Sequence, residues 1–154
     1  MTAIAILLID DEKAFTEILA TRLTRRGYAV TCAESGDHGL QCLRDNEEIA
    51  VVVLDLAMPG KDGLTTLAAI KALRPLVEVI MLTGQGSVTA AVDAVRKGAF
   101  NYLQKPCEVD DLAATIADAW QHREVRRKKI LEVRMDPYIS GEKRKEMIAA
   151  ILGE

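Results

Sequence analysis

The chain has 154 residues, a net charge of −3 at pH 7, 49% apolar residues and 28% charged residues. These values are typical of a soluble globular protein with one core, and the charge balance favours neither a nucleic-acid-binding segment nor a membrane protein. The three cysteines lack CxxC spacing, so we expect no disulfide framework and no zinc site. The first apolar run is too short for a signal or membrane segment, so we expect a cytoplasmic protein.

The first half of the chain predicts three strands, at residues 4–9, 28–32 and 49–54, because these runs are apolar and of strand length. A helix lies between the first two strands and ends at Gly27. A shorter helix, capped by Ser35, lies between the second and third strands. The third run is continuously apolar, as in a central parallel strand covered on both faces.

The second half predicts two more strands, at 77–82 and 99–103. The helix before the first of them must end ahead of Pro75, Ser87 caps the next helix, and a last helix begins near Glu108. Five strand–helix units in alternation predict an α/β domain with a parallel sheet and right-handed crossovers.

The end of the chain differs from the body in charge, since the first 120 residues carry a net −6 and the remainder a net +3. We expect a domain over residues 1–122 and a basic helical tail or truncated linker over 123–154. Pro137 breaks any extension of the last helix, and Ser140 is placed to cap a short helix after it. This short helix is either a solvated, frayed extension or an element for dimerisation or docking.

Polar residues follow four of the predicted strands, at the sheet edge where parallel sheets bind ligands. Clustered carboxylates tolerate one another when a hard divalent cation neutralises them, and oxygen ligands favour Mg²⁺. A carboxylate beside such an ion can attack a phosphoryl group, while an ammonium and a hydroxyl stabilise the phosphoryl oxygens. The residues concerned are Asp10, Asp11 and Glu12 after the first strand, Asp55 after the third, Thr83 after the fourth and Lys105 after the fifth.

The segments "IDDE", "LDLAMPGKDG", "LTGQG" and "YLQKP" resemble the receiver domain of bacterial two-component response regulators, over roughly residues 3–122. The resemblance implies a (βα)5 flavodoxin-like fold, a doubly wound parallel sheet with strand order 2-1-3-4-5. Here a C-terminal helical extension follows it. The same resemblance implies a phosphoprotein that acts in signal transduction.

The resemblance also implies a role for each site residue. Asp55 accepts phosphate from the phosphohistidine of a histidine kinase in a Mg²⁺-dependent reaction. Asp11 and Asp55 bind Mg²⁺ through their side chains, Ala57 through its backbone carbonyl, and Asp10 mostly through water. Lys105 contacts Asp55 and then the phosphoryl group, and its bond to the following proline is cis. Glu12 is left as an orienting or merely solvated acid.

Signalling in the resembled family depends on a switch, which assigns Thr83 a second role and adds Tyr102. Phosphorylation draws the Thr83 hydroxyl toward the phosphoryl group, and Tyr102 follows inward. The surface of the fourth helix, fifth strand and fifth helix then changes and regulates a protein partner or an attached output domain. The implied phosphate donor is a sensor histidine kinase or a histidine phosphotransfer protein, and a homodimer is one possible assembly. We expect no enzyme beyond a phosphoacceptor that catalyses its own phosphorylation and dephosphorylation, and no direct nucleic-acid or membrane binding.

Several alternatives stay open at this stage. The chain is either a single-domain regulator or a receiver cut from a longer protein, and a phosphorelay intermediate is a close variant. A phosphatase with an aspartyl-phosphate intermediate needs a second acid two residues after the nucleophile, where Ala57 stands. A constitutive scaffold is disfavoured because no residue of the active set is missing. A flavin-binding flavodoxin relative is disfavoured because no Ser/Thr/Gly-rich loop follows the first strand.

Overall fold

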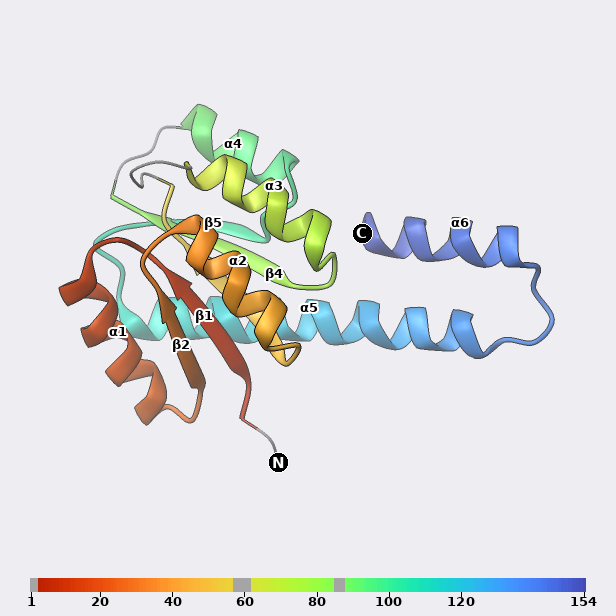
Figure 1. Ribbon diagram of the computed structural model, residues 1–154, viewed down its shortest axis with the longest axis horizontal. Coiled ribbons are helices and arrows are strands. Elements are labelled where there is room, and N and C mark those ends of the chain that lie inside the picture. Colours follow the sequence, from red (N-terminus) through yellow and green to blue (C-terminus); the bar gives the residue numbers. More distant parts are fainter. Residues whose placement is uncertain (1–2, 57–61, 85–87) are drawn as a thin grey trace.

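A parallel sheet of five strands forms the centre of the computed structural model, which describes residues 3–56, 62–84 and 88–154 (Figure 1). The order β2-β1-β3-β4-β5 confirms the predicted doubly wound, flavodoxin-like topology. All four pairs of neighbouring strands are parallel. The strands are β1 (Ala5–Ile9), β2 (Ala29–Ala33), β3 (Ile49–Leu54), β4 (Glu78–Thr83) and β5 (Asn101–Gln104).

Helices cover both faces of this sheet (Figure 1). The helices are α1 (Lys13–Arg25), α2 (Gly36–Asp45), α3 (Gly63–Leu73), α4 (Val88–Arg96), α5 (Val109–Met135) and α6 (Gly141–Leu152). The first and fifth helices pack on one apolar cluster, while α2, α3 and α4 pack on the other. Within the described ranges, no helix is long and apolar enough to cross a membrane.

The alternating direction of side chains along the strands explains the two apolar clusters, one on each face of the sheet. Successive strand residues point to opposite faces, so Leu7 of β1 packs with α2 and α3 while Leu8 packs with α1 and α5. Every residue of β3 is buried, as its continuous apolar run predicts. The sheet is therefore a rigid platform whose strand ends hold the polar residues in place.

The fifth strand begins at Asn101, two residues later than predicted. Gly98 ends the preceding helix with a left-handed φ of 106°. A residue with a side chain would adopt this conformation only at a cost in free energy. The N–H of Ala99 then donates to the Ala94 carbonyl at 3.0 Å, and Phe100 donates to Val79 at 2.7 Å. The residues after Gly98 therefore close the turn before the strand starts.

The C-terminal extension is a helical hairpin. The fifth helix has 27 residues and is continuous through residue 122, so the predicted domain division falls within it. It ends at Met135, two residues before Pro137, and α6 runs back antiparallel to it (Figure 1). Ser140 caps α6 by accepting a hydrogen bond from the N–H of Lys143 at 3.1 Å. The apolar side of α6 packs against α5, so this chain itself covers that side.

A buried ion pair anchors the hairpin to the sheet. Glu78 at the start of β4 and Arg126 on α5 are 2% and 3% exposed, and the Arg126 Nη2 donates to Glu78 Oε1. The second guanidinium nitrogen, Nη1, donates to the Leu152 carbonyl of α6 at 3.0 Å. His122 Nδ1 lies 3.2 Å from the other Glu78 oxygen. One arginine thus links the sheet, α5 and the last turn of α6.

Candidate functional site

Strand pairing brings the acidic residues of two loops together at one edge of the sheet. Ile9 of β1 pairs with Leu54 of β3, so Asp10 and Asp55 follow at the same level. The Asp55 N–H donates to the Ile9 carbonyl at 3.0 Å, which extends the pairing into the loop. The predicted clustering of these carboxylates therefore follows from strand register.

Three carboxylates meet at this edge. Asp10, Asp11 and Asp55 each offer an oxygen, and these oxygens all lie within 4.8 Å of one another. Asp10 and Asp55 are 6% and 5% exposed, whereas Asp11 is exposed to solvent. Burial raises the pKa of the Asp10 carboxyl, and the Asp55 carboxylate adds to this rise, while Lys105 and the Glu12 N–H oppose it. The Asp10 carboxyl therefore gives up its proton less readily than an exposed aspartate does.

The donor set fits a hard divalent cation. All three side chains offer oxygen, and an exposed Asp11 leaves room for the water ligands that Mg²⁺ normally keeps. A dication also relieves the repulsion among carboxylates that burial makes costly. The implied fourth ligand, the carbonyl of Ala57, lies outside the described residues, as does Ser87.

Lys105 joins the cluster from the end of β5. Its Nζ donates to Asp10 Oδ2 at 2.7 Å and to Glu12 Oε1 at 3.0 Å, and it lies 3.7 Å from Asp55 Oδ2. Burial lowers the pKa of this ammonium, but the hydrogen bonds to Asp10 and Glu12 outweigh burial, so the pKa is raised. The Lys105–Pro106 bond is cis, as the resemblance implies. Lys105 is therefore a fixed cation between the loops that follow β1 and β3.

The remaining predicted residues, Thr83 and Tyr102, lie on β4 and β5. Thr83 is 1% exposed, and its carbonyl accepts the N–H of Lys105 at 2.9 Å. Tyr102 packs against the cluster under α2, α3 and α4. Burial raises the pKa of its phenol, and the Asp55 carboxylate raises it further. Its hydroxyl is buried without a hydrogen-bond partner in the described part of the chain.

The start of α3 is packed tightly against the backbone of the acceptor loop. A Cβ at Gly63 would lie 2.5 Å from the Asp55 carbonyl oxygen and 2.5 Å from Leu56 Cα. Only glycine permits this approach without a shift of the loop. Gly63 thereby helps to define the position of Asp55.

Two contacts at the site were not anticipated. Glu12, left as orienting or solvated, forms the ion pair with Lys105. Phe15 on the first turn of α1 was assigned only to the apolar face of its helix, yet its ring centroid lies 4.2 Å from Lys105 Nζ. An aromatic residue at helical spacing gives no sequence signal that distinguishes a core residue from a cation's neighbour.

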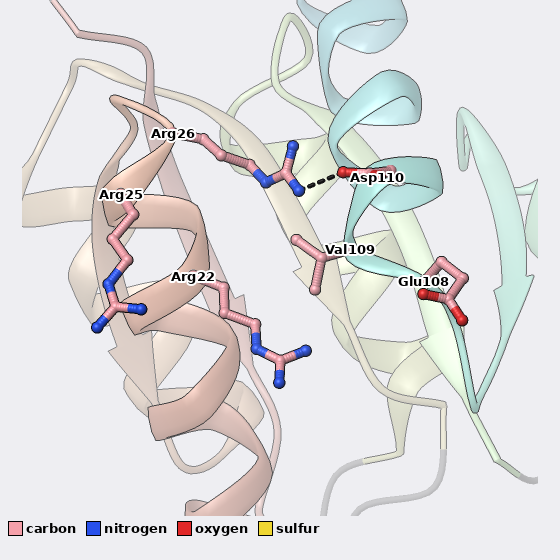
Figure 2. Close-up of a pocket in the computed structure, with 6 residues that line it drawn as sticks. All are labelled: Arg22, Arg25, Arg26, Glu108, Val109 and Asp110. Atoms are coloured by element: carbon pink, nitrogen blue, oxygen red, sulfur yellow. Dashed lines mark hydrogen bonds and ion pairs between the residues drawn. The ribbon is translucent and has the colours of Figure 1, made fainter.

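A separate hollow of about 400 Å³ lies between the end of α1 and the start of α5 (Figure 2). Arg22, Arg25 and Arg26 line one side, and an ion pair between Arg26 and Asp110 crosses it (Figure 2). None of the predicted site residues lines this hollow. Its lining holds three arginines and two acids, Glu108 and Asp110, and Asp110 is already paired with Arg26.

The raised pKa of Asp10 leads to a prediction on stability. Without Mg²⁺, Asp10→Asn is expected to raise the melting temperature at pH 7, because the amide cannot carry the buried charge. A raised folded-state pKa means that wild-type stability falls as pH rises through the window between the unfolded and folded values. The advantage of Asp10→Asn should therefore grow with pH from about 3.8 upward. Thermal unfolding in EDTA at several pH values checks this, and a variant less stable than wild type at pH 7 contradicts it.

The family model described as "Response regulator receiver domain" matches residues 6–117. The transcriptional regulatory protein GlrR of Escherichia coli is 41% identical over 114 residues, which cover 74% of this chain and 26% of GlrR. The chain thus spans about a quarter of the length of that regulator.

Solved structures of receiver domains also resemble this chain. A response regulator receiver domain protein from Clostridium thermocellum superposes with a TM-score of 0.75 at 36% identity, covering 79% of this chain and 97% of that one. The beryllofluoride-activated NtrC4 receiver domain dimer superposes with a TM-score of 0.73 at 34% identity, covering 77% of this chain and 98% of that one.

The expectation that the chain is not an enzyme is wrong. The matched family model is that of the response regulator receiver domain, and receiver domains of this family have autophosphatase activity. The expectation included self-catalysed dephosphorylation, and its error was to count that activity as no enzyme.

Proposed function

This chain belongs to the family of response regulator receiver domains, and we propose that it is a phosphorylation-dependent switch whose phosphoacceptor is Asp55. The observation that carries the proposal is the convergence of two other carboxylates and the Lys105 ammonium on Asp55. Asp55 lies beside the Lys105 ammonium, which can stabilise the negative charge of an incoming phosphoryl group.

The chemistry follows from the positions of the side chains. An Asp55 carboxylate oxygen attacks the phosphorus of a phosphohistidine, the P–N bond breaks, and the imidazole leaves with the electron pair and takes up a proton. Asp10, Asp11 and Asp55 would hold Mg²⁺, which supplies positive charge to the phosphoryl oxygens. Lys105, 3.7 Å from Asp55, donates to a second oxygen, and the Thr83 hydroxyl donates to the third.

The switch is proposed to act through α4, β5 and α5. Thr83 ends β4, and its strand neighbour β5 carries Tyr102, whose buried hydroxyl lacks a partner among the described residues. Movement of Thr83 toward the phosphoryl group frees space that Tyr102 fills. The adjacent helix α4 exposes Val88, Val92 and Val95, which are 82%, 43% and 53% exposed. This apolar helix face is suited to bind a protein partner after the change.

Partners and setting are proposed on the same basis. A cytoplasmic histidine kinase or histidine phosphotransfer protein supplies the phosphate. Residues 1–122 act as the receiver, and the tail 123–154 leads to an output domain or stands alone. GlrR is a transcriptional regulatory protein of which this chain matches about a quarter, which supports an output domain. The NtrC4 receiver forms a dimer, which supports a homodimer of the activated form.

The test is phosphorylation by acetyl phosphate followed by intact mass. With Mg²⁺, the wild type should gain about 80 Da, the mass of one phosphoryl group, and hydroxylamine should remove it. Asp55→Asn, or wild type with EDTA, should gain nothing. An adduct that persists in Asp55→Asn, or its absence from wild type with Mg²⁺, contradicts Asp55 as the acceptor.

A further inference from the structure

The Lys105 ammonium has two kinds of neighbour, carboxylate oxygens and an aromatic ring. Carboxylate oxygens of Asp10 and Glu12 accept its protons at 2.7 and 3.0 Å, and the Phe15 ring centroid lies 4.2 Å away. The Lys105 side chain is 12% exposed, so the ring acts where little water competes for the cation. Phe15 also lines the small cavity that Asp10 and Asp55 border, which places it directly at the site.

An aromatic face attracts an ammonium through its quadrupole but accepts no strong hydrogen bond from it. The three N–H groups of Lys105 thus stay available to oxygen acceptors while the ring fixes where the nitrogen sits. Phe15 is on the first turn of α1, immediately after the loop that carries Asp10, Asp11 and Glu12. The ring and the acids that contact the cation therefore belong to one short segment, residues 10–15.

We infer that Phe15 is a positioning residue for phosphoryl transfer, which holds the Lys105 ammonium beside Asp55 so that it meets the phosphoryl oxygen in the right place. The inference rests on the proposed function, since it assigns Phe15 a role only if Asp55 is phosphorylated. The cation must turn its protons from Asp10 and Glu12 to the incoming oxygen. The ring keeps the nitrogen in place during this change, because its attraction does not depend on the direction of the N–H bonds.

The experiment distinguishes the effect of the aromatic face from the effect of side-chain volume. Phe15→Met keeps a large apolar side chain but removes the aromatic face, whereas Phe15→Tyr keeps the face. With acetyl phosphate at saturating Mg²⁺, Phe15→Met should slow phosphorylation about three- to thirty-fold, the range expected for one cation–π contact. Phe15→Tyr should stay within about two-fold of wild type. The Mg²⁺ concentration that gives half the maximal rate should not change in either variant, because Phe15 is not a ligand.

Phe100→Met is the matched control. Phe100 is partly buried in the same apolar cluster as Phe15, but it lies before β5 and contacts His122, away from the carboxylates. The control should lose stability without a change in phosphorylation rate. A wild-type rate in Phe15→Met, or an equal loss in Phe15→Tyr or Phe100→Met, overturns the inference. If the wild type itself gains no Asp55-dependent phosphate, the proposed function fails and the inference fails with it.

Discussion

Asp11→Ala is expected to slow Mg²⁺-dependent phosphorylation on the order of 100- to 1,000-fold while the apo fold stays intact or becomes slightly more stable. Asp11 is the exposed member of the three-carboxylate cluster, so it is the ligand that an entering cation meets first. A bound metal stabilises transferring phosphoryl oxygens by several kcal/mol, and each 1.36 kcal/mol changes a rate tenfold. Removing a carboxylate also relieves repulsion in the metal-free protein.

The rate of acetyl phosphate incorporation, measured across a Mg²⁺ titration, checks this expectation. Glu48→Ala is a matched control, because Glu48 is an exposed acid just before β3, at the opposite end of that strand from Asp55. The control should behave as wild type at every Mg²⁺ concentration. If Asp11→Ala is phosphorylated at the wild-type rate at low Mg²⁺, Asp11 is not a ligand.

Arg126→Leu is expected to have the largest effect on stability, a loss of about 3–5 kcal/mol of unfolding free energy. The change removes the cation that pairs with Glu78, a carboxylate that is 2% exposed. His122, at 3.2 Å, and the more distant Lys71 ammonium then remain as its neighbours. It also removes the donor to the Leu152 carbonyl, so the last turn of α6 loses its link to the sheet. Urea unfolding monitored by circular dichroism gives the free energy.

The double variant Glu78→Leu/Arg126→Leu tests whether the loss of stability comes from leaving one buried charge without its partner. With both charges gone, no uncompensated charge remains, so the double variant should be more stable than either single variant. Lys129→Leu is the control, because Lys129 lies on the same helix and forms an exposed ion pair with Glu154 at 3.1 Å. Exposed pairs contribute at most about 1 kcal/mol. A double variant whose loss equals the sum of the single losses shows that the pair has no mutual stabilisation.

The parallel sheet was predictable because strands buried on both faces are continuous apolar runs in the sequence. The run at residues 49–54 is apolar throughout, and the structure buries every residue of it. Resemblance then supplied the strand order, which alternation alone does not determine. The start of β5 was less predictable, since Ala99 and Phe100 are apolar enough for a strand but serve to close a turn.

The carboxylate cluster was predictable because register places residues after parallel strands at one edge. The hydrogen-bond partners of Lys105 were not predictable, since they depend on the direction in which a long side chain points. The sequence left Glu12 undecided, and the structure shows its carboxylate 3.0 Å from the ammonium. Pairs between residues far apart in the sequence were not predictable either. Arg126 lies in a basic tail whose composition is typical of a solvated segment, and its buried partner, Glu78, lies 48 positions earlier.

The central claim is that Asp55 carries the phosphate, and chemical trapping tests it most directly. Reduction of the phosphorylated protein with borohydride converts an aspartyl phosphate to homoserine, which peptide mass spectrometry locates. The expected result is homoserine at position 55 and unmodified aspartate at positions 10 and 11. Homoserine at position 10 or 11, or phosphate on a histidine or hydroxyl residue instead, would contradict the assignment of the site.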